Sequence, residues 1–150
     1  MNKDCYCHPL NRVTAICSNN LNKILFLRTQ EAENTNILSL PGDFVRYGEL
    51  TEEAIRRSIF DQTTLCVEPI DILGIYSKIY NQSGIHIIES VFVCIITNSP
   101  KMGSKIDPPQ CVWLDRDKIE TMEGNICDIK IVKDYYLWRT QKSTFWSTKI

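Results

Sequence analysis

The chain has 150 residues, which is the size of one domain with an ordinary hydrophobic core. Hydrophobic residues make up 43% of it and charged residues 23%, as in a typical globular protein. The net charge of −1 provides no broad positive field, which excludes an extended DNA or RNA surface. We expect a single domain over residues 1–150, with a loose lead-in at 1–10 and a tail at 142–150.

The cysteines indicate whether the protein is expected in a reducing or an oxidising compartment. There are seven of them, an odd number, and several lie in apolar runs, which favours reduced, buried thiols over a disulfide framework. The first residues lack the apolar core of a signal sequence, and the longest apolar run, residues 91–96, is too short to cross a membrane. We therefore expect a cytoplasmic protein without a membrane partner. Cys5, Cys7 and His8 look like part of a zinc site, but zinc needs four ligands and no second pair follows, so incidental thiols are favoured.

The first third of the chain predicts short strands. Residues 12–17 and 23–29 are rich in apolar and β-branched residues and flank a Ser-Asn-Asn turn, so they predict a hairpin. Residues 30–36 are polar and predict a loop. Residues 37–40 predict a short strand that leads into a Pro-Gly turn, and residues 44–46 are predicted to be extended.

A second Gly turn at Gly48 then leads into a helix. Thr51 is a candidate N-cap, and Glu52 and Glu53 lie in the first turn, where the helix dipole favours negative charge. Ile55 and Ile59 can pack on a sheet. At about 100° per residue, one arc beside them holds four polar side chains: Arg57, Ser58, Asp61 and Gln62.

The rest of the chain predicts a second hairpin and two helices. Residues 70–79 and 85–97 flank a turn at 81–84, and Gly74 predicts a bulge in the first strand. The apolar run in the second strand indicates a central strand covered on both faces, and His86 and Glu89 in it could point into a cleft or be satisfied within the sheet. After these come a loop at 98–110, a strand at 111–114, a helical turn at 115–119, and a helix from Asp128 to about Thr140, whose segment 129–132 could alternatively form a strand.

The stretch from Leu40 to Leu65 resembles the Nudix box, the signature of the Nudix hydrolases. Without a gap, common Nudix usage is matched by the residues Leu40, Pro41, Gly42, Phe44, Val45, Gly48, Glu49, Glu52, Glu53, Ala54, Arg57, Ile59, Thr63 and Leu65. The box is degenerate where the chemistry is expected. Asp43 replaces the box Gly, Ser58 the Glu after the Arg, Asp61-Gln62 the Glu-Glu pair, and Thr64 the closing Gly.

The resemblance implies a Nudix-type α/β/α sandwich, an α/β (α+β) fold with a mixed central sheet. It also implies metal-assisted attack of water on a nucleoside diphosphate linked to another group, with Mg²⁺ or Mn²⁺ held by oxygen ligands. Carried over by position, Asp61 is expected to be a catalytic metal ligand, Glu49 a second acid that binds metal or orients water, and Arg57 the residue that aligns Glu49. The weaker metal ligands are a Gln62 carbonyl and a Ser58 hydroxyl, and Asp43 is a candidate for restoring charge.

Three functions follow. The first is an atypical Nudix hydrolase that acts on a small-molecule nucleotide derivative with weakly bound metal, because two neutral residues replace carboxylates in the metal site. The second is an impaired Nudix-fold domain that binds a nucleotide-like ligand or a protein partner. The third is an unrelated binding domain with an accidental match. Plain structural roles are also open: Glu49 and Arg57 as an ion pair, and Asp61 as an exposed acid. A homodimer is common among Nudix proteins.

Overall fold

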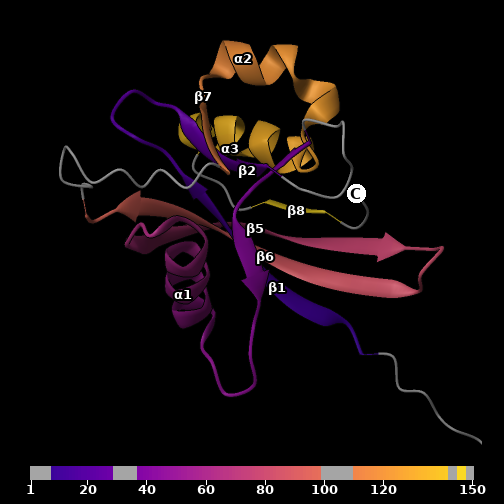
Figure 1. Ribbon diagram of the computed structural model, residues 1–150. Coiled ribbons are helices and arrows are strands. Elements are labelled where there is room, and N and C mark those ends of the chain that lie inside the picture. The colour runs from indigo at the N-terminus through magenta and orange to yellow at the C-terminus, as the bar shows by residue number, and fades with distance from the viewer. Residues whose placement is uncertain (1–7, 29–36, 99–109, 142–144, 148–150) are drawn as a thin grey trace, which may run out of the picture.

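The computed structural model describes residues 8–28, 37–98 and 110–141 and the backbone of residues 145–147. Its strands form two sheets (Figure 1). The five-stranded sheet has the order β4-β1-β6-β5-β8, with β1 Leu10–Cys17, β4 Gly42–Phe44, β5 Val67–Tyr80, β6 Ile85–Ile96 and β8 Phe145–Ser147. The three-stranded sheet has the order β3-β2-β7, with β2 Ile24–Arg28, β3 Leu38–Ser39 and β7 Cys111–Leu114.

The five-stranded sheet is mixed, as predicted. β1 runs parallel to β6 and antiparallel to β4, while β5 runs antiparallel to β6 and parallel to β8. β6 is therefore a central strand, and Val91, Val93 and Cys94 within it are buried. Ile95 is exposed, so the predicted cover on both faces does not reach the end of the run.

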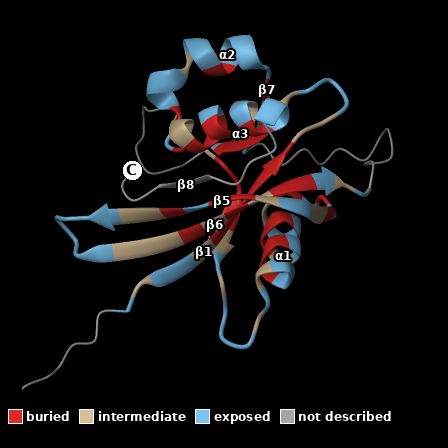
Figure 2. Cartoon of the chain, turned by 180° about the vertical axis from the view of Figure 1, so that it is seen from behind, coloured by how far each residue is buried: buried red, intermediate tan, exposed pale blue. Residues whose placement is uncertain are grey.

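Helices cover both faces of the sheets. α1 (Thr51–Thr63) packs on one side, and α2 (Arg116–Thr121), η1 (Glu123–Asn125) and α3 (Ile129–Gln141) lie on the other (Figure 1). Two buried clusters result from alternation along the strands. Val13, Ala15 and Cys17 point to α1, and Ile16 points to α3. Figure 2 shows the buried residues on the sides of the helices that face the sheets. The predicted α/β/α sandwich is confirmed.

The second predicted hairpin is present and the first is not. β5 and β6 pair around the turn at 81–84, with a register shift at Gly74 as expected. β1 and β2 follow each other in the chain but belong to different sheets, and only one bridge, Ser18 to Ile24, joins them. The hairpin prediction was wrong because β1 pairs with β4 and β6 while β2 pairs with β3 and β7, and a turn sequence alone does not determine which strands pair.

Two local expectations need correction. Leu50, not Thr51, is the N-cap of α1, and its N–H donates to Glu53 Oε2 at 2.9 Å while Thr51 begins the helix. The predicted tail contains β8, whose backbone pairs with Gly74 to Tyr76 at the sheet edge. The predicted loop at 30–36 and residues 99–109 of the predicted loop at 98–110 lie outside the described residues, as do Cys5 and Cys7.

Five described cysteines are free thiols, but only Cys17 and Cys94 are buried, while Cys66 and Cys127 are exposed. The expectation of buried thiols therefore holds for two of them. Within the described part of the chain, no helix is long and apolar enough to cross a membrane.

Candidate functional site

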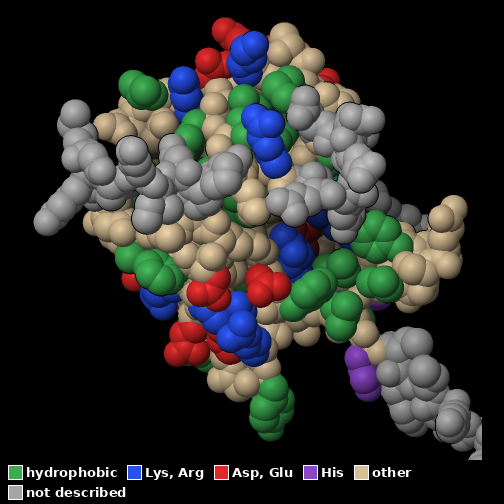
Figure 3. Space-filling model, viewed as in Figure 1, with side chains coloured by type: hydrophobic (Ala, Val, Ile, Leu, Met, Phe, Trp, Pro, Cys, Tyr) green, Lys and Arg blue, Asp and Glu red, His purple; other side chains and the backbone are tan. Residues whose placement is uncertain are grey.

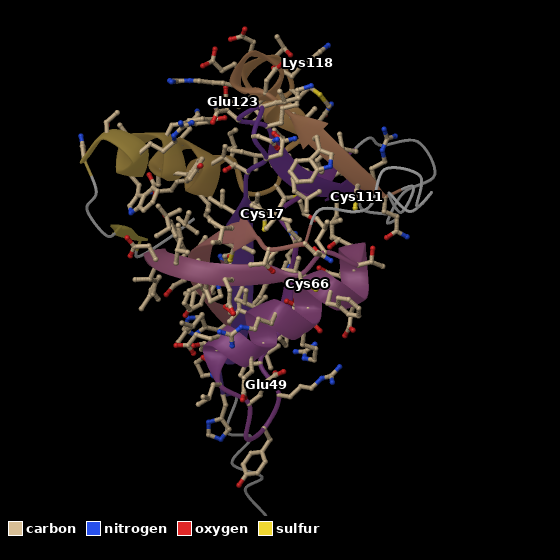
Figure 4. All side chains as sticks on the ribbon, turned by 90° about the vertical axis from the view of Figure 1, so that its left-hand side faces the viewer. Cys17, Glu49, Cys66, Cys111, Lys118 and Glu123 are labelled. Carbon is tan, nitrogen blue, oxygen red and sulfur yellow. The ribbon has the colours of Figure 1, made fainter. Side chains whose placement is uncertain are left out.

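The loop between β4 and α1 is held against the helix by side chains of the predicted site. Figure 4 shows Glu49 beside α1, at the opposite end of the molecule from Lys118 and Glu123. Gly48 has a φ of 80°, which a glycine adopts without strain, and this lets the loop turn back so that Glu49 faces the helix. Figure 3 shows acidic and basic side chains intermixed on the lower part of the face that it presents.

Arg57 on α1 is the centre of this contact. Its Nε lies 2.6 Å from Glu49 Oε1, and its Nη2 lies 3.1 Å from Glu49 Oε2, a two-point pair that is among the stronger hydrogen-bonded ion pairs. Arg57 Nη1 donates to Asp43 Oδ2 at 3.0 Å, and Nη2 donates to the carbonyl of Phe44 at 3.0 Å. The predicted pairing of Glu49 with Arg57 is therefore present, and Asp43 joins it.

The acids of this cluster are held ionised. Hydrogen bonds from the Arg57 side chain and the Arg46 N–H lower the pKa of Glu49 to about 2. Burial acts to raise the pKa of Asp43, but the Phe44 N–H and Arg57 together outweigh it, so that the pKa is lowered. The same contacts, that with Glu49 first, raise the pKa of Arg57. Both carboxylates are therefore negatively charged partners of one guanidinium, not free bases.

Gln62 joins the helix to the first residue of β4. Its Nε2 donates to the Gly42 carbonyl at 2.9 Å, and its Oε1 accepts from the Gly42 N–H at 3.1 Å. Gly42 in turn lies against β1, and a Cβ at this position would be 2.1 Å from the Val13 carbonyl oxygen. The predicted Gln62 carbonyl ligand is thus engaged with the backbone.

Ser58 and Asp61 lie on different sides of α1. Ser58 is buried on the face that packs on the sheet, with its hydroxyl donating to the Ile55 carbonyl at 3.2 Å. Asp61 is exposed, and it makes no hydrogen bond or ion pair with the residues that the structure describes. The shared arc predicted for these residues is therefore split, because the sheet covers the Ser58 side of the helix.

A divalent cation of the kind that the Nudix box implies does not fit this donor set. Mg²⁺ is usually held by one or two carboxylates together with several waters, yet here Glu49 and Asp43 are paired with Arg57, and Gln62 is paired with Gly42. No group of three or more His, Cys, Asp or Glu side chains suited to a metal occurs among the described residues. Among the predicted ligands, Asp61 is the one carboxylate without a partner in the described part of the chain. The catalytic and metal roles of these residues stay predictions.

A buried network of charges adjoins the Gly42 turn. Glu89 on β6 is 1% exposed, accepts a hydrogen bond from the Thr14 hydroxyl, and lies 3.5 Å from Arg12 Nε. Lys78 Nζ on β5 lies 2.6 Å from Glu89 Oε2, an ion pair that is not aligned as a hydrogen bond.

The network continues from Lys78 to the start of α3. Lys78 Nζ is 2.5 Å from Asp128 Oδ1, and Asp128 Oδ2 accepts from the Leu40 N–H at 3.3 Å. Burial acts to lower the pKa of Lys78, but the two carboxylates outweigh it and raise the pKa. Glu89 was noticed in the sequence and Lys78 was missed, although a lysine inside an apolar strand run is the signal that marks it.

A hollow in the described part of the chain lies elsewhere. A cavity of about 460 Å³ opens between α2, η1 and α3, on the opposite side of the sheets from α1. Its charged residues are already paired with each other, Arg116 with Glu120 and Lys133 with Glu123. We place the candidate site at the Gly42–Gln62 segment because Arg57 contacts Glu49 and Asp43 there and Gln62 contacts Gly42.

The chain is similar to known proteins. The family model described as NUDIX domain matches residues 8–135. An ADP-ribose pyrophosphatase of Methanocaldococcus jannaschii is 31% identical over 135 residues, covering 89% of this chain and 77% of that protein.

Solved structures share the fold. A NUDIX hydrolase from Nitrosomonas europaea superposes with a TM-score of 0.74 at 18% identity, covering 87% of this chain and 90% of that one. The MutT protein of Methanosarcina mazei Go1 gives a TM-score of 0.66 at 24% identity, covering 90% and 97%. A match over most of the sequence, with the β4–α1 segment in the place that the box spacing predicts, shows that the chain belongs to the NUDIX domain family.

Proposed function

We propose that the chain binds a nucleoside diphosphate linked to another group, with ADP-ribose as the first candidate, and that its box does not support metal-assisted hydrolysis. The ligand class is supported by family membership and by the relative described as an ADP-ribose pyrophosphatase. The observation that carries the proposal is that three of the predicted metal ligands, Glu49, Asp43 and Gln62, are engaged within the protein. Arg57 holds Glu49 and Asp43, and Gly42 holds Gln62.

The second candidate is slow metal-assisted hydrolysis. One observation favours it: Asp61 is an exposed carboxylate without a partner among the described residues, at a box position where a Nudix hydrolase has a glutamate. Glu49, another acid of the predicted site, has a pKa of about 2 and is ionised at neutral pH. A cation would have to be held with one free carboxylate and water, which makes for weak binding.

Asp61→Asn separates the two candidates. Binding of ADP-ribose, diadenosine polyphosphates and nucleoside triphosphates is measured by calorimetry in EDTA, Mg²⁺ and Mn²⁺, and products are followed by chromatography. For a binder we expect no turnover, and an affinity in EDTA that rises a few-fold in Asp61→Asn because a negative charge near the diphosphate is removed. For a hydrolase, the wild type produces mononucleotide with metal and Asp61→Asn abolishes this.

Asp117→Asn is the matched control, since Asp117 is an exposed acid on α2, across the sheets from α1. It should leave the affinity unchanged. No heat of binding with any of these nucleotides would refute the proposed ligand class, and metal-dependent turnover would refute the binding-only function.

A further inference from the structure

We infer that the Gln62 side-chain amide takes the place of a bound cation in fastening the box loop to α1, so that this site is shaped without metal. The inference builds on the proposed function, because it concerns how the same site keeps its form. Two hydrogen bonds join Gln62 to Gly42. Gln62 Nε2 donates to the Gly42 carbonyl at 2.9 Å, and the Gly42 N–H donates to Gln62 Oε1 at 3.1 Å.

The chemistry of the two groups explains why an amide suits this position. The Gly42 backbone presents one donor and one acceptor, and a Gln side chain presents the complementary acceptor and donor. A carboxylate at residue 62 has only acceptors at neutral pH. It would bind the Gly42 N–H but would face the Gly42 carbonyl oxygen at about the same distance, oxygen against oxygen. A cation between the two oxygens would resolve that repulsion, as would the N–H that Gln62 provides.

The surrounding charges agree with a loop that is closed without an ion. Arg57 already places a positive group between the acidic residues of the loop and the helix, touching Asp43, Glu49 and the Phe44 carbonyl. A divalent cation at the same place would compete with the guanidinium for these oxygens. Gln62 and Arg57 thus fasten the two ends of the loop, at Gly42 and at Glu49.

Gly42 also limits how far the loop can adjust. An added Cβ there would meet the Val13 carbonyl oxygen at 2.1 Å and Thr14 Cα at 2.9 Å, so the backbone is in close contact with β1. The Gly42 carbonyl is consequently directed at residue 62 by the sheet. A substitution at residue 62 therefore removes or restores the hydrogen bonds to Gly42, because the loop cannot move to compensate.

The test compares wild type, Gln62→Glu and Gln62→Met at pH 8, where the introduced glutamate is ionised. Thermal unfolding is measured in EDTA and in 10 mM Mg²⁺, with no nucleotide present, so the result is independent of the proposed ligand. We expect the wild-type Tm to be the same within about 1 °C in both buffers. The Tm of both variants should fall by roughly 3–6 °C in EDTA, which corresponds to the loss of a partly buried pair of hydrogen bonds in a chain of this size.

Magnesium should then restore at least half of that loss in Gln62→Glu and none in Gln62→Met, which keeps the volume but offers no oxygen. Hydrogen exchange of the Gly42 N–H in the wild type gives a second readout and should be equally slow in EDTA and in Mg²⁺. The inference is overturned if Mg²⁺ raises the wild-type Tm as much as that of Gln62→Glu, if neither variant loses stability in EDTA, or if Mg²⁺ restores both variants or neither.

Discussion

Replacing Gly42 with alanine should destabilise the fold strongly, because the residue lies against the backbone of β1. The new Cβ would be 2.1 Å from the Val13 carbonyl oxygen, 2.9 Å from Thr14 Cα and 3.0 Å from Thr14 Oγ1. Only the last atom can rotate away. The first two belong to a strand that is paired with β4 on one side and β6 on the other. Relief therefore requires separating β4 from β1, with loss of the Gln62 pair.

We expect Gly42→Ala to lower the free energy of unfolding by about 3 kcal/mol, the upper part of the usual range for an overpacked interior. In a chain of this size that lowers the Tm by roughly 6–12 °C. The measurement is urea unfolding followed by circular dichroism, with Gly124→Ala as the matched control, because nothing lies within 4 Å of a Cβ at Gly124. The control should change stability by less than about 0.5 kcal/mol. Equal stability of the two variants would refute the reasoning that β4 lies too close to β1 to accept a side chain at residue 42.

Three further predictions concern charge and backbone strain. Lys78→Met leaves the carboxylates of Glu89 and Asp128 without their shared cation. We expect a loss of about 3–5 kcal/mol at pH 7 in urea unfolding, because removing one partner leaves buried charges uncompensated; a loss below about 1 kcal/mol would contradict this. Glu49 has a folded pKa of about 2 against an ordinary value of 4.5, so its stabilisation is present above pH 4.5 and is lost as the pH falls from there toward 2. Arg57→Met should flatten the wild-type pH dependence in that window, and an unchanged slope would show that the pairing does not control the pKa. Thr64 caps α1 with a φ of 62°, which is strained for a β-branched residue, so Thr64→Gly should raise the free energy of unfolding by about 0.5–1 kcal/mol; a lowered urea midpoint would refute the strain.

The sequence allowed the local elements and the layers to be predicted, since these depend on periodicity and turn residues that lie close together. The β5–β6 hairpin, the bulge at Gly74 and α1 could all be predicted in this way. The placement of β1 beside β6, and not beside β2, could not be predicted. Strand pairing is chosen by which apolar faces are buried together, and that choice involves the whole chain.

The same limit applies to the site. The pairing of Glu49 with Arg57 followed from their positions in the box spacing and is present. The burial of Ser58 could not be predicted, because the helical arc alone does not say where the sheet edge lies. The Gln62–Gly42 bonds depend on the position of the loop after folding. The Lys78–Glu89–Asp128 network joins residues from two strands and the start of a helix, which no local pattern connects.

The place of β1 between β4 and β6 also bears on how the chain folds. The Thr14–Glu89 contact spans 75 positions, and the whole of β1 is paired with β6 at similar separations. Such a high contact order slows folding, because the ends of a long loop must meet before the pairing stabilises anything. During synthesis, β1 therefore waits with one edge open until β6 has left the ribosome, and an unpaired edge is prone to aggregation. Expression should consequently be more sensitive to substitutions in β6 than in the later α3.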